Sequence, residues 1–136
     1  MTSDPRRVDD QAAPEPDGSS VGPPEPGSRD IAEVPALEVV STAALHLMSA
    51  AAVHLGLAED LPDHRDLDEA RMLIDALAGL VTASAPRMGH HHAAPIRDGL
   101  RSLQLAFREA SEVPDAPGQA PGEQLTGPVS PTRSGR

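Results

Sequence analysis

The chain contains no cysteine, lysine, asparagine, tyrosine or tryptophan, and Phe107 is its only Phe, Trp or Tyr residue. The absence of cysteine excludes disulfides and thiolate metal sites. With one aromatic side chain, a core must be built from Ala, Leu, Val, Ile and Met. In so short a chain such a core is marginal, and small proteins of this kind often depend on a second subunit.

Positive charge is also scarce. Twenty-one Asp and Glu residues stand against 11 arginines, which gives a formal net charge of −10. Nucleic-acid binders need a basic surface to neutralise phosphates, so this balance argues against that class. The N-terminus lacks the apolar segment of a secretory signal, and we expect a cytoplasmic protein.

Large apolar residues are rare at both ends of the chain. Residues 1–33 form an acidic, proline-rich arm, and residues 113–136 form a tail rich in proline and glycine. Such segments bury too little surface to offset the entropy of ordering, so both are predicted to be disordered. The remaining residues, 34–112, are predicted to form a small all-α domain of three helices.

The first predicted helix, residues 34–57, is apolar on all sides. Residues 39–58 carry no charged side chain, and Glu38 and Glu59 flank them. Pro35 suits the first turn of this helix, and Gly56 lies near its end. A helix that is apolar all round is normally buried on every side.

Two amphipathic helices follow. Asp66 is a candidate cap for a helix over residues 67–84, with Glu69 completing a capping box and Pro86 ending the helix. Its apolar face is formed by Leu67, Ala70, Leu73, Ile74, Leu77, Leu80 and Val81. The third helix is predicted from Pro95 to residue 111. Its apolar stripe is Ile96, Leu100, Leu103 and Phe107, and Gly99 indicates close helix packing.

The long apolar run over residues 39–58 could span a bilayer or lie inside a protein. Its flanks are acidic, no Trp or Tyr marks an interface, and His46 and His54 interrupt it, so membrane association is the less favoured alternative. Two one-faced helices cannot cover all sides of the first helix. We therefore predict a homodimer in which the first helices meet through small residues, with this interface: Ala44, Leu47, Met48, Ala51 and Leu55.

The histidines are the main candidates for chemistry. His90, His91 and His92 are possible metal ligands, but three adjacent residues in a loop between helices rarely converge on one ion. His46 and His54 lie near one helical face, as a hydrogen-bonded pair of ordinary helix residues or as a pH-sensitive pair across a dimer. The arginines Arg71, Arg97, Arg101 and Arg108 read as a solvated face, and an anion site there has no specific support. No catalytic constellation or cofactor motif is recognisable, which leaves an enzyme of unknown class as an alternative.

Three stretches, EVVSTAALHLMSAAAVHLGLAED, DLDEARMLIDALAGL and IRDGLRSLQLAF, follow one another between residues 31 and 112. Together they resemble the bacterial family called domain of unknown function 1844, and the composition, typical of a GC-rich genome, fits an actinobacterial member. The resemblance implies a small, soluble, helical protein and supplies no catalytic residue. The sequence thus favours a cytoplasmic, homodimeric interaction or regulatory module with no cofactor. Its acidic arm would be free for a protein partner.

Overall fold

The computed structural model describes residues 30–58, 60 and 64–130. These residues form a 3₁₀ turn, η3 (Ile31–Glu33), and four α-helices: α3 (Ala36–His54), α4 (Leu67–Met88), α5 (His90–Ala110) and α6 (Glu123–Thr126). No strand occurs among them, which confirms the predicted all-α fold with three long helices. The chain divides between Pro35 and Ala36 into two units.

The first unit contributes η3. Asp30 caps this turn, because the Ala32 N–H donates to Asp30 Oδ1 at 3.0 Å. The arm that was predicted to be disordered covers residues 1–33. Of these, residues 1–29 lie outside the described part of the chain.

The second unit begins with α3, which starts directly after Pro35. Its C-terminal end has a Schellman motif: Leu57 N–H donates to Ala52 O and Gly56 N–H donates to Val53 O, both at 3.0 Å. Gly56 has a φ of +80°, a conformation that favours glycine over residues with a side chain. The helix is therefore shorter at both ends than the predicted range 34–57, and Gly56 lies in the turn that follows it.

Asp66 caps α4 as predicted, since its Oδ1 accepts hydrogen bonds from Asp68 N–H at 3.1 Å and Glu69 N–H at 3.2 Å. In a complete capping box, the Glu69 side chain would accept a hydrogen bond from Asp66 N–H. Here Asp66 N–H donates instead to His54 O at 2.8 Å. This bond ties the start of α4 to the last residue of α3.

The prediction that Pro86 ends the second helix is wrong, because α4 continues to Met88. Proline lacks only the N–H that would donate to the carbonyl of Thr82, four residues earlier. Both residues are exposed, and Pro86 lies two residues before the end of the helix.

The prediction that His90, His91 and His92 lie in a loop is also wrong. Gly89, with a φ of +85°, makes the whole turn between the helices, and its carbonyl accepts the first hydrogen bond of α5 from Ala93 N–H at 3.0 Å. The helix therefore starts at His90 rather than Pro95. A single glycine with a positive φ therefore takes the place of the predicted loop of several residues.

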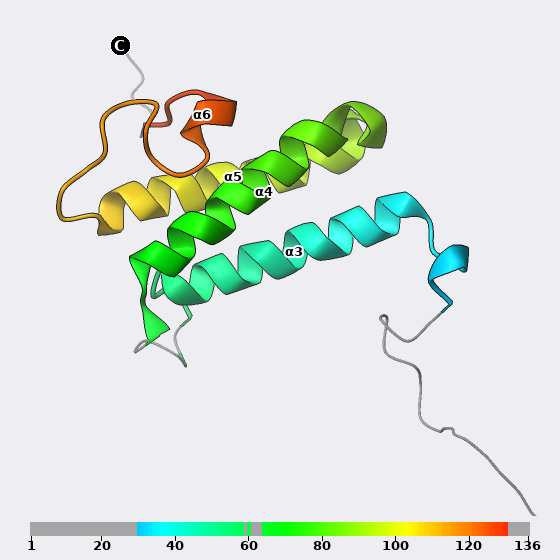
Figure 1. Ribbon diagram of the computed structural model, residues 1–136, viewed down its shortest axis with the longest axis horizontal. Helices are drawn as coiled ribbons and strands as arrows, with labels where there is room; N and C mark the ends of the chain where they lie inside the picture. Colours follow the sequence, from blue (N-terminus) through cyan, green and yellow to red (C-terminus); the bar gives the residue numbers. More distant parts are fainter. Residues whose placement is uncertain (1–29, 59, 61–63, 131–136) are drawn as a thin grey trace, which may run out of the picture. The chain divides into compact units, whose positions relative to one another are not determined.

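The core lies where the three long helices meet. The apolar stripe predicted for α5 is buried throughout. The residues of the apolar face predicted for α4 are buried or half-buried. The side chains at the centre are Ala44 and Ala51 of α3, Leu55 directly after α3, Ala70, Ile74, Leu77, Ala78 and Val81 of α4, and Ile96, Leu100, Leu103 and Phe107 of α5. In Figure 1, α3 lies on one side of the α4–α5 pair.

Residues 113–130, here called the C-terminal segment, lie on the other side of that pair (Figure 1). This corrects the prediction of a disordered tail over residues 113–136, of which 131–136 lie outside the described residues. Ala120, Pro121, Glu123 and Val129 of the segment are buried. Hydrogen bonds and ion pairs also attach the segment to α4 and α5, and composition alone does not reveal such contacts.

Candidate functional site

Of the five residues predicted to form a dimer interface, four lie on the inner face of α3, and Leu55 directly follows the helix. Ala44, Ala51 and Leu55 are buried, and Leu47 and Met48 are half-buried against the core of the same chain. The small residues do permit close helix packing, but the partners are α4 and α5 rather than a second α3. These residues therefore pack within the single chain, and the surface that α3 leaves exposed is on the opposite side of the helix.

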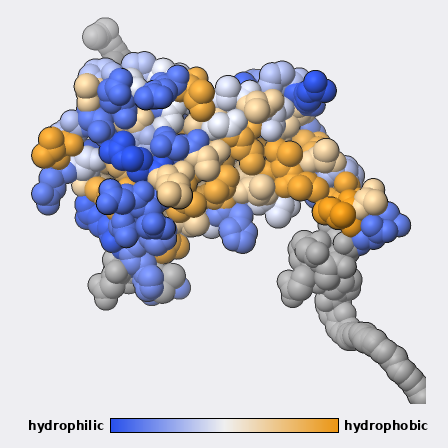
Figure 2. Space-filling model, in the orientation of Figure 1, coloured by the Kyte–Doolittle hydropathy of each residue, from blue (hydrophilic) through white to orange (hydrophobic). Residues whose placement is uncertain are grey.

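That opposite side is the outer face of α3, defined by a helical stripe of Val39, Thr42, Leu45, His46 and Ser49, all exposed, and half-buried Val53. Leu45 is 59% exposed. Figure 2 shows apolar surface along this part of the molecule. No charged side chain occurs between Val39 and Val53, so the stripe is an uncovered, uncharged surface on an otherwise acidic protein.

By length and composition alone, α3 could also cross a membrane. Only Ala44 and Ala51 of its 19 residues are fully buried. The core helix of a soluble protein can have the same length and composition, but such a helix is mostly buried, whereas α3 is not. The helix therefore has an incomplete cover within the single chain.

The histidines do not form a common site. His54 Nδ1 lies 2.9 Å from His64 O and forms a hydrogen bond with it, whereas His46 is exposed on the outer face of α3. His90, His91 and His92 occupy the exposed first turn of α5, and the rings of His91 and His92 stack edge to face. Within the described residues, no three His, Cys, Asp or Glu side chains gather as a metal site would require.

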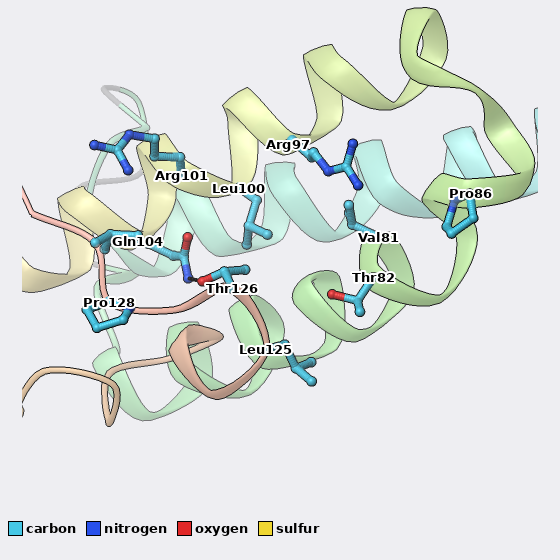
Figure 3. A pocket seen from close by; sticks show the side chains of 11 residues that line it. Val81, Thr82, Pro86, Arg97, Leu100, Arg101, Gln104, Leu125, Thr126 and Pro128 are labelled. Carbon is cyan, nitrogen blue, oxygen red and sulfur yellow. Dashed lines mark hydrogen bonds between the residues drawn. The ribbon is translucent and has the colours of Figure 1, made fainter.

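A groove runs between α4, α5 and the C-terminal segment, with a volume of about 390 Å³ (Figure 3). It is called here the α4–α5 groove. Arg97 and Arg101 stand on its α5 wall, and Leu125 and Thr126 come from the C-terminal segment. The other lining residues are Val81, Thr82, Pro86, Leu100, Gln104, Pro128 and Val129.

The groove exists because the C-terminal segment is fastened to α5. Glu123 is 2% exposed, and its carboxylate accepts hydrogen bonds from the Arg108 side chain, Gly118 N–H at 2.9 Å and Val129 N–H at 3.2 Å. Burial alone would raise the pKa of the Glu123 carboxyl, but these hydrogen bonds outweigh it and hold that pKa below its ordinary value. The hydrogen bond to Glu123 raises the pKa of Arg108.

Gln104 provides a second attachment. Its side chain is 2% exposed, and its Nε2 donates to Pro121 O and to Thr126 Oγ1, both at 3.1 Å. Gly122 N–H adds a 2.7 Å hydrogen bond to Asp75 Oδ1 of α4. The segment is therefore fixed at several points across α4 and α5, and so are the groove residues that it contributes.

Sequence reasoning named Arg97 and Arg101 but treated them as a solvated face, and it missed Leu125, Thr126 and Val129 by placing them in a disordered tail. No apolar periodicity surrounds these three residues in the sequence. These residues are held in place by Gln104 and Arg108 of α5, whose hydrogen-bond acceptors lie more than ten residues away in the sequence. No pattern in the sequence identifies such long-range partners.

These observations define a small all-α domain of three packed helices, with one uncovered helix face and a groove closed by a C-terminal segment. A family model, domain of unknown function (DUF1844), matches residues 36–109. That range is more than half of the chain, and the protein belongs to this family, as the resemblance implied. Two further comparisons, one with curated proteins and one with solved structures, gave no match. The C-terminal segment lies beyond the matched range, which ends within α5.

Proposed function

We propose that the protein is a homodimeric interaction module in the cytoplasm, and that two copies meet through the outer face of α3. One observation carries the proposal: α3 exposes an uncharged stripe that includes the apolar side chains of Val39 and Leu45, while its other side is packed against α4 and α5. Exposed apolar patches on soluble proteins commonly mark interaction surfaces. A second copy offers the same surface and so covers both stripes at once.

The size of the surface predicts a weak dimer. A helix of 19 residues is about 28 Å long, at 1.5 Å per residue. With a contact width of about 12 Å, it would bury on the order of 400 Å² per copy through α3 alone. Stable interfaces bury about 800 Å² per partner. We therefore expect a reversible, concentration-dependent dimer rather than a permanent one.

An antiparallel arrangement of the two α3 helices fits the stripe best. The stripe is nearly symmetric about Leu45 and His46, with valines at both ends, Val39 and Val53. In an antiparallel pair, Val39 of one copy lies near Val53 of the other, and the two Glu38 carboxylates are far apart. A parallel pair would bring those carboxylates together and align the helix dipoles unfavourably.

Sedimentation equilibrium over micromolar to submillimolar concentrations tests this proposal. Leu45→Glu should abolish the dimer, because it places two desolvated carboxylates at the centre of the interface. The matched control is Met72→Glu on α4, because Met72 is 68% exposed but lies off the stripe. This control should dimerise like the wild type. A wild type that stays monomeric up to several hundred micromolar would overturn the proposal.

Membrane association through α3 is the second candidate, because α3 has the length and composition of a membrane span. Flotation of the full chain with lipid vesicles separates the two. Recovery of the wild type with vesicles, and loss of that recovery in Leu45→Glu, would favour the membrane. Recovery of both proteins in the unbound fraction is the result expected for the dimer.

The proposed role is binding rather than catalysis. Within the described residues no three His, Asp or Glu side chains gather at one place, and the acids of the first turn of α4 flank its cap. The dimer would present the acidic arm, residues 1–33, twice, so that a basic protein partner could contact two copies of it. Mass spectrometry of proteins captured by the full chain and by a variant lacking residues 1–33 tests the arm's role.

A further inference from the structure

We propose that the α4–α5 groove binds a small carboxylic acid with an aliphatic body. The groove lies on the side of the α4–α5 pair away from α3, so this site is independent of the proposed dimer. Its volume of about 390 Å³ falls within the range of small-molecule sites. The ligand class follows from three features of its lining.

The first feature is an apolar floor and wall. Val81, Leu100 and Val129 are buried at the base, one from each of the three chain segments that form the groove. Leu125 is 54% exposed beside them. An aliphatic group in the groove would cover Leu125 and remove apolar surface on both sides from water.

The second feature is an arginine without a partner. The ion pairs of the described residues are Arg71–Asp115 and Arg108–Glu123, so Arg97 has no carboxylate partner in that part of the chain. In Figure 3 its guanidinium reaches over the groove near Val81. Arg101 instead donates to Ser130 O at 3.1 Å. A guanidinium pairs well with a carboxylate, and Arg97 is the side chain placed to do so.

The third feature is a pair of hydrogen-bond acceptors on residues that line the groove, Thr82 and Gln104. Gln104 uses its Nε2 for Pro121 and Thr126, and no described residue donates to its Oε1. The carbonyl of Thr82 lacks the usual helical donor because residue 86 is proline. A ligand with an N–H or O–H group near its carboxylate would satisfy one of these acceptors.

The acyl amino acid N-acetyl-leucine combines these three properties and serves as the probe. Its amide, N-acetyl-leucinamide, is the matched control because it differs only in the carboxylate. The test is titration of the ¹⁵N-labelled full chain, followed by chemical shifts of the amides of Thr82, Leu125 and Thr126. For a fragment of this size we expect a dissociation constant on the order of 1 mM.

The amide should bind at least tenfold more weakly than the acid. Arg97→Gln should weaken binding of the acid by a similar factor, and Leu125→Ala should weaken acid and amide alike. Arg87→Gln, an exposed arginine outside the groove, should leave binding unchanged. Leu45→Glu should also bind normally, which separates this inference from the dimer.

Two results would overturn the inference. One is the absence of groove shifts at 20 mM N-acetyl-leucine, or equal shifts with the acid and the amide. The other is binding of an acetylated pentapeptide with a C-terminal leucine more than tenfold tighter than N-acetyl-leucine, which would assign the groove to a polypeptide terminus instead of a small molecule. Similar or weaker binding of the pentapeptide supports the inference.

Discussion

Arg108 and Glu123 form a two-point ion pair that fastens α6 to α5. Arg108 Nε donates to Glu123 Oε2 and Arg108 Nη2 donates to Glu123 Oε1, both at 2.7 Å. Arg108 also donates to Asp115 O and Ala116 O, at 3.0 and 3.3 Å. One arginine therefore organises both the start of the C-terminal segment and its buried carboxylate, and the α4–α5 groove depends on this contact.

Glu123→Gln should release the C-terminal segment. The substitution leaves Arg108 without its charge partner, and removing one member of a buried ion pair typically costs about 3–5 kcal/mol. We expect amide hydrogen exchange at Gly118 and Val129 to become fast, while the amides of α4 stay protected, because the helical core does not depend on Glu123.

The control for this prediction is Glu112→Gln, since Glu112 is exposed and lies just before the segment. It should leave the exchange pattern unchanged. The double variant Arg108→Met/Glu123→Leu removes both charges, so it should recover part of the lost protection. Slow exchange at Gly118 in Glu123→Gln would contradict the assigned role of the ion pair.

Acid should release the same segment. The pKa of Glu123 is lowered in the folded protein, so its contribution to stability is complete above the ordinary glutamate pKa and is lost as the pH falls through the lower folded value. We therefore expect the segment to detach below about pH 4, where an unperturbed glutamate is protonated. Gly118 exchange or limited proteolysis after residue 112 measures this. Glu123→Gln should show no comparable transition, because it has already lost the charge.

Gly99 of α5 packs closely against Met48 of α3. A Cβ added at Gly99 would overlap Met48 Cε, whereas one added at Gly79 of α4 would meet only Leu125 Cδ1 at 4.0 Å. Gly79→Ala should stabilise the protein by roughly 0.5–1 kcal/mol through helix propensity. Gly99→Ala should gain less than this or lose stability, because Met48 must move. Urea denaturation measures both, and equal gains would show that α3 and α5 are not in close contact there.

The Met48→Ala background is the control for the Gly99 prediction. With the thioether removed, the two alanine substitutions should stabilise the protein by similar amounts. The sequence alone predicted close packing at Gly99, and the structure confirms it by placing Met48 of α3 against this glycine.

The two amphipathic helices were predictable because their apolar residues recur on one face. Ile74, Leu77, Ile96 and Leu100 are spaced so that only one orientation buries them all. Their ends were less predictable. Pro86 and Pro95 both lie inside helices, each within two turns of a helix end, although proline removes a hydrogen bond to the preceding turn.

The face of α3 that packs inward could not be predicted, because the helix is apolar on every side. Ala44 and Leu45 are neighbours of similar character in the sequence, yet Ala44 is buried and Leu45 is 59% exposed. The C-terminal segment was missed for a different reason. Its attachment rests on Glu123 and Gln104, polar residues whose burial depends on partners that no local pattern identifies.

Single cysteines can test the proposed antiparallel dimer directly, because the chain has no native cysteine. His46→Cys lies near the proposed two-fold axis and should form a disulfide-linked dimer under mild oxidation, measured by non-reducing electrophoresis. Val39→Cys alone should not cross-link efficiently, because the two copies of residue 39 are at opposite ends of the pair. A mixture of Val39→Cys and Val53→Cys should give a heterodimer.

Ala83→Cys, exposed on α4, is the control for random collision. Efficient cross-linking of Val39→Cys to itself would instead require parallel helices, and equal cross-linking of all four variants would mean that the outer face of α3 is not the interface.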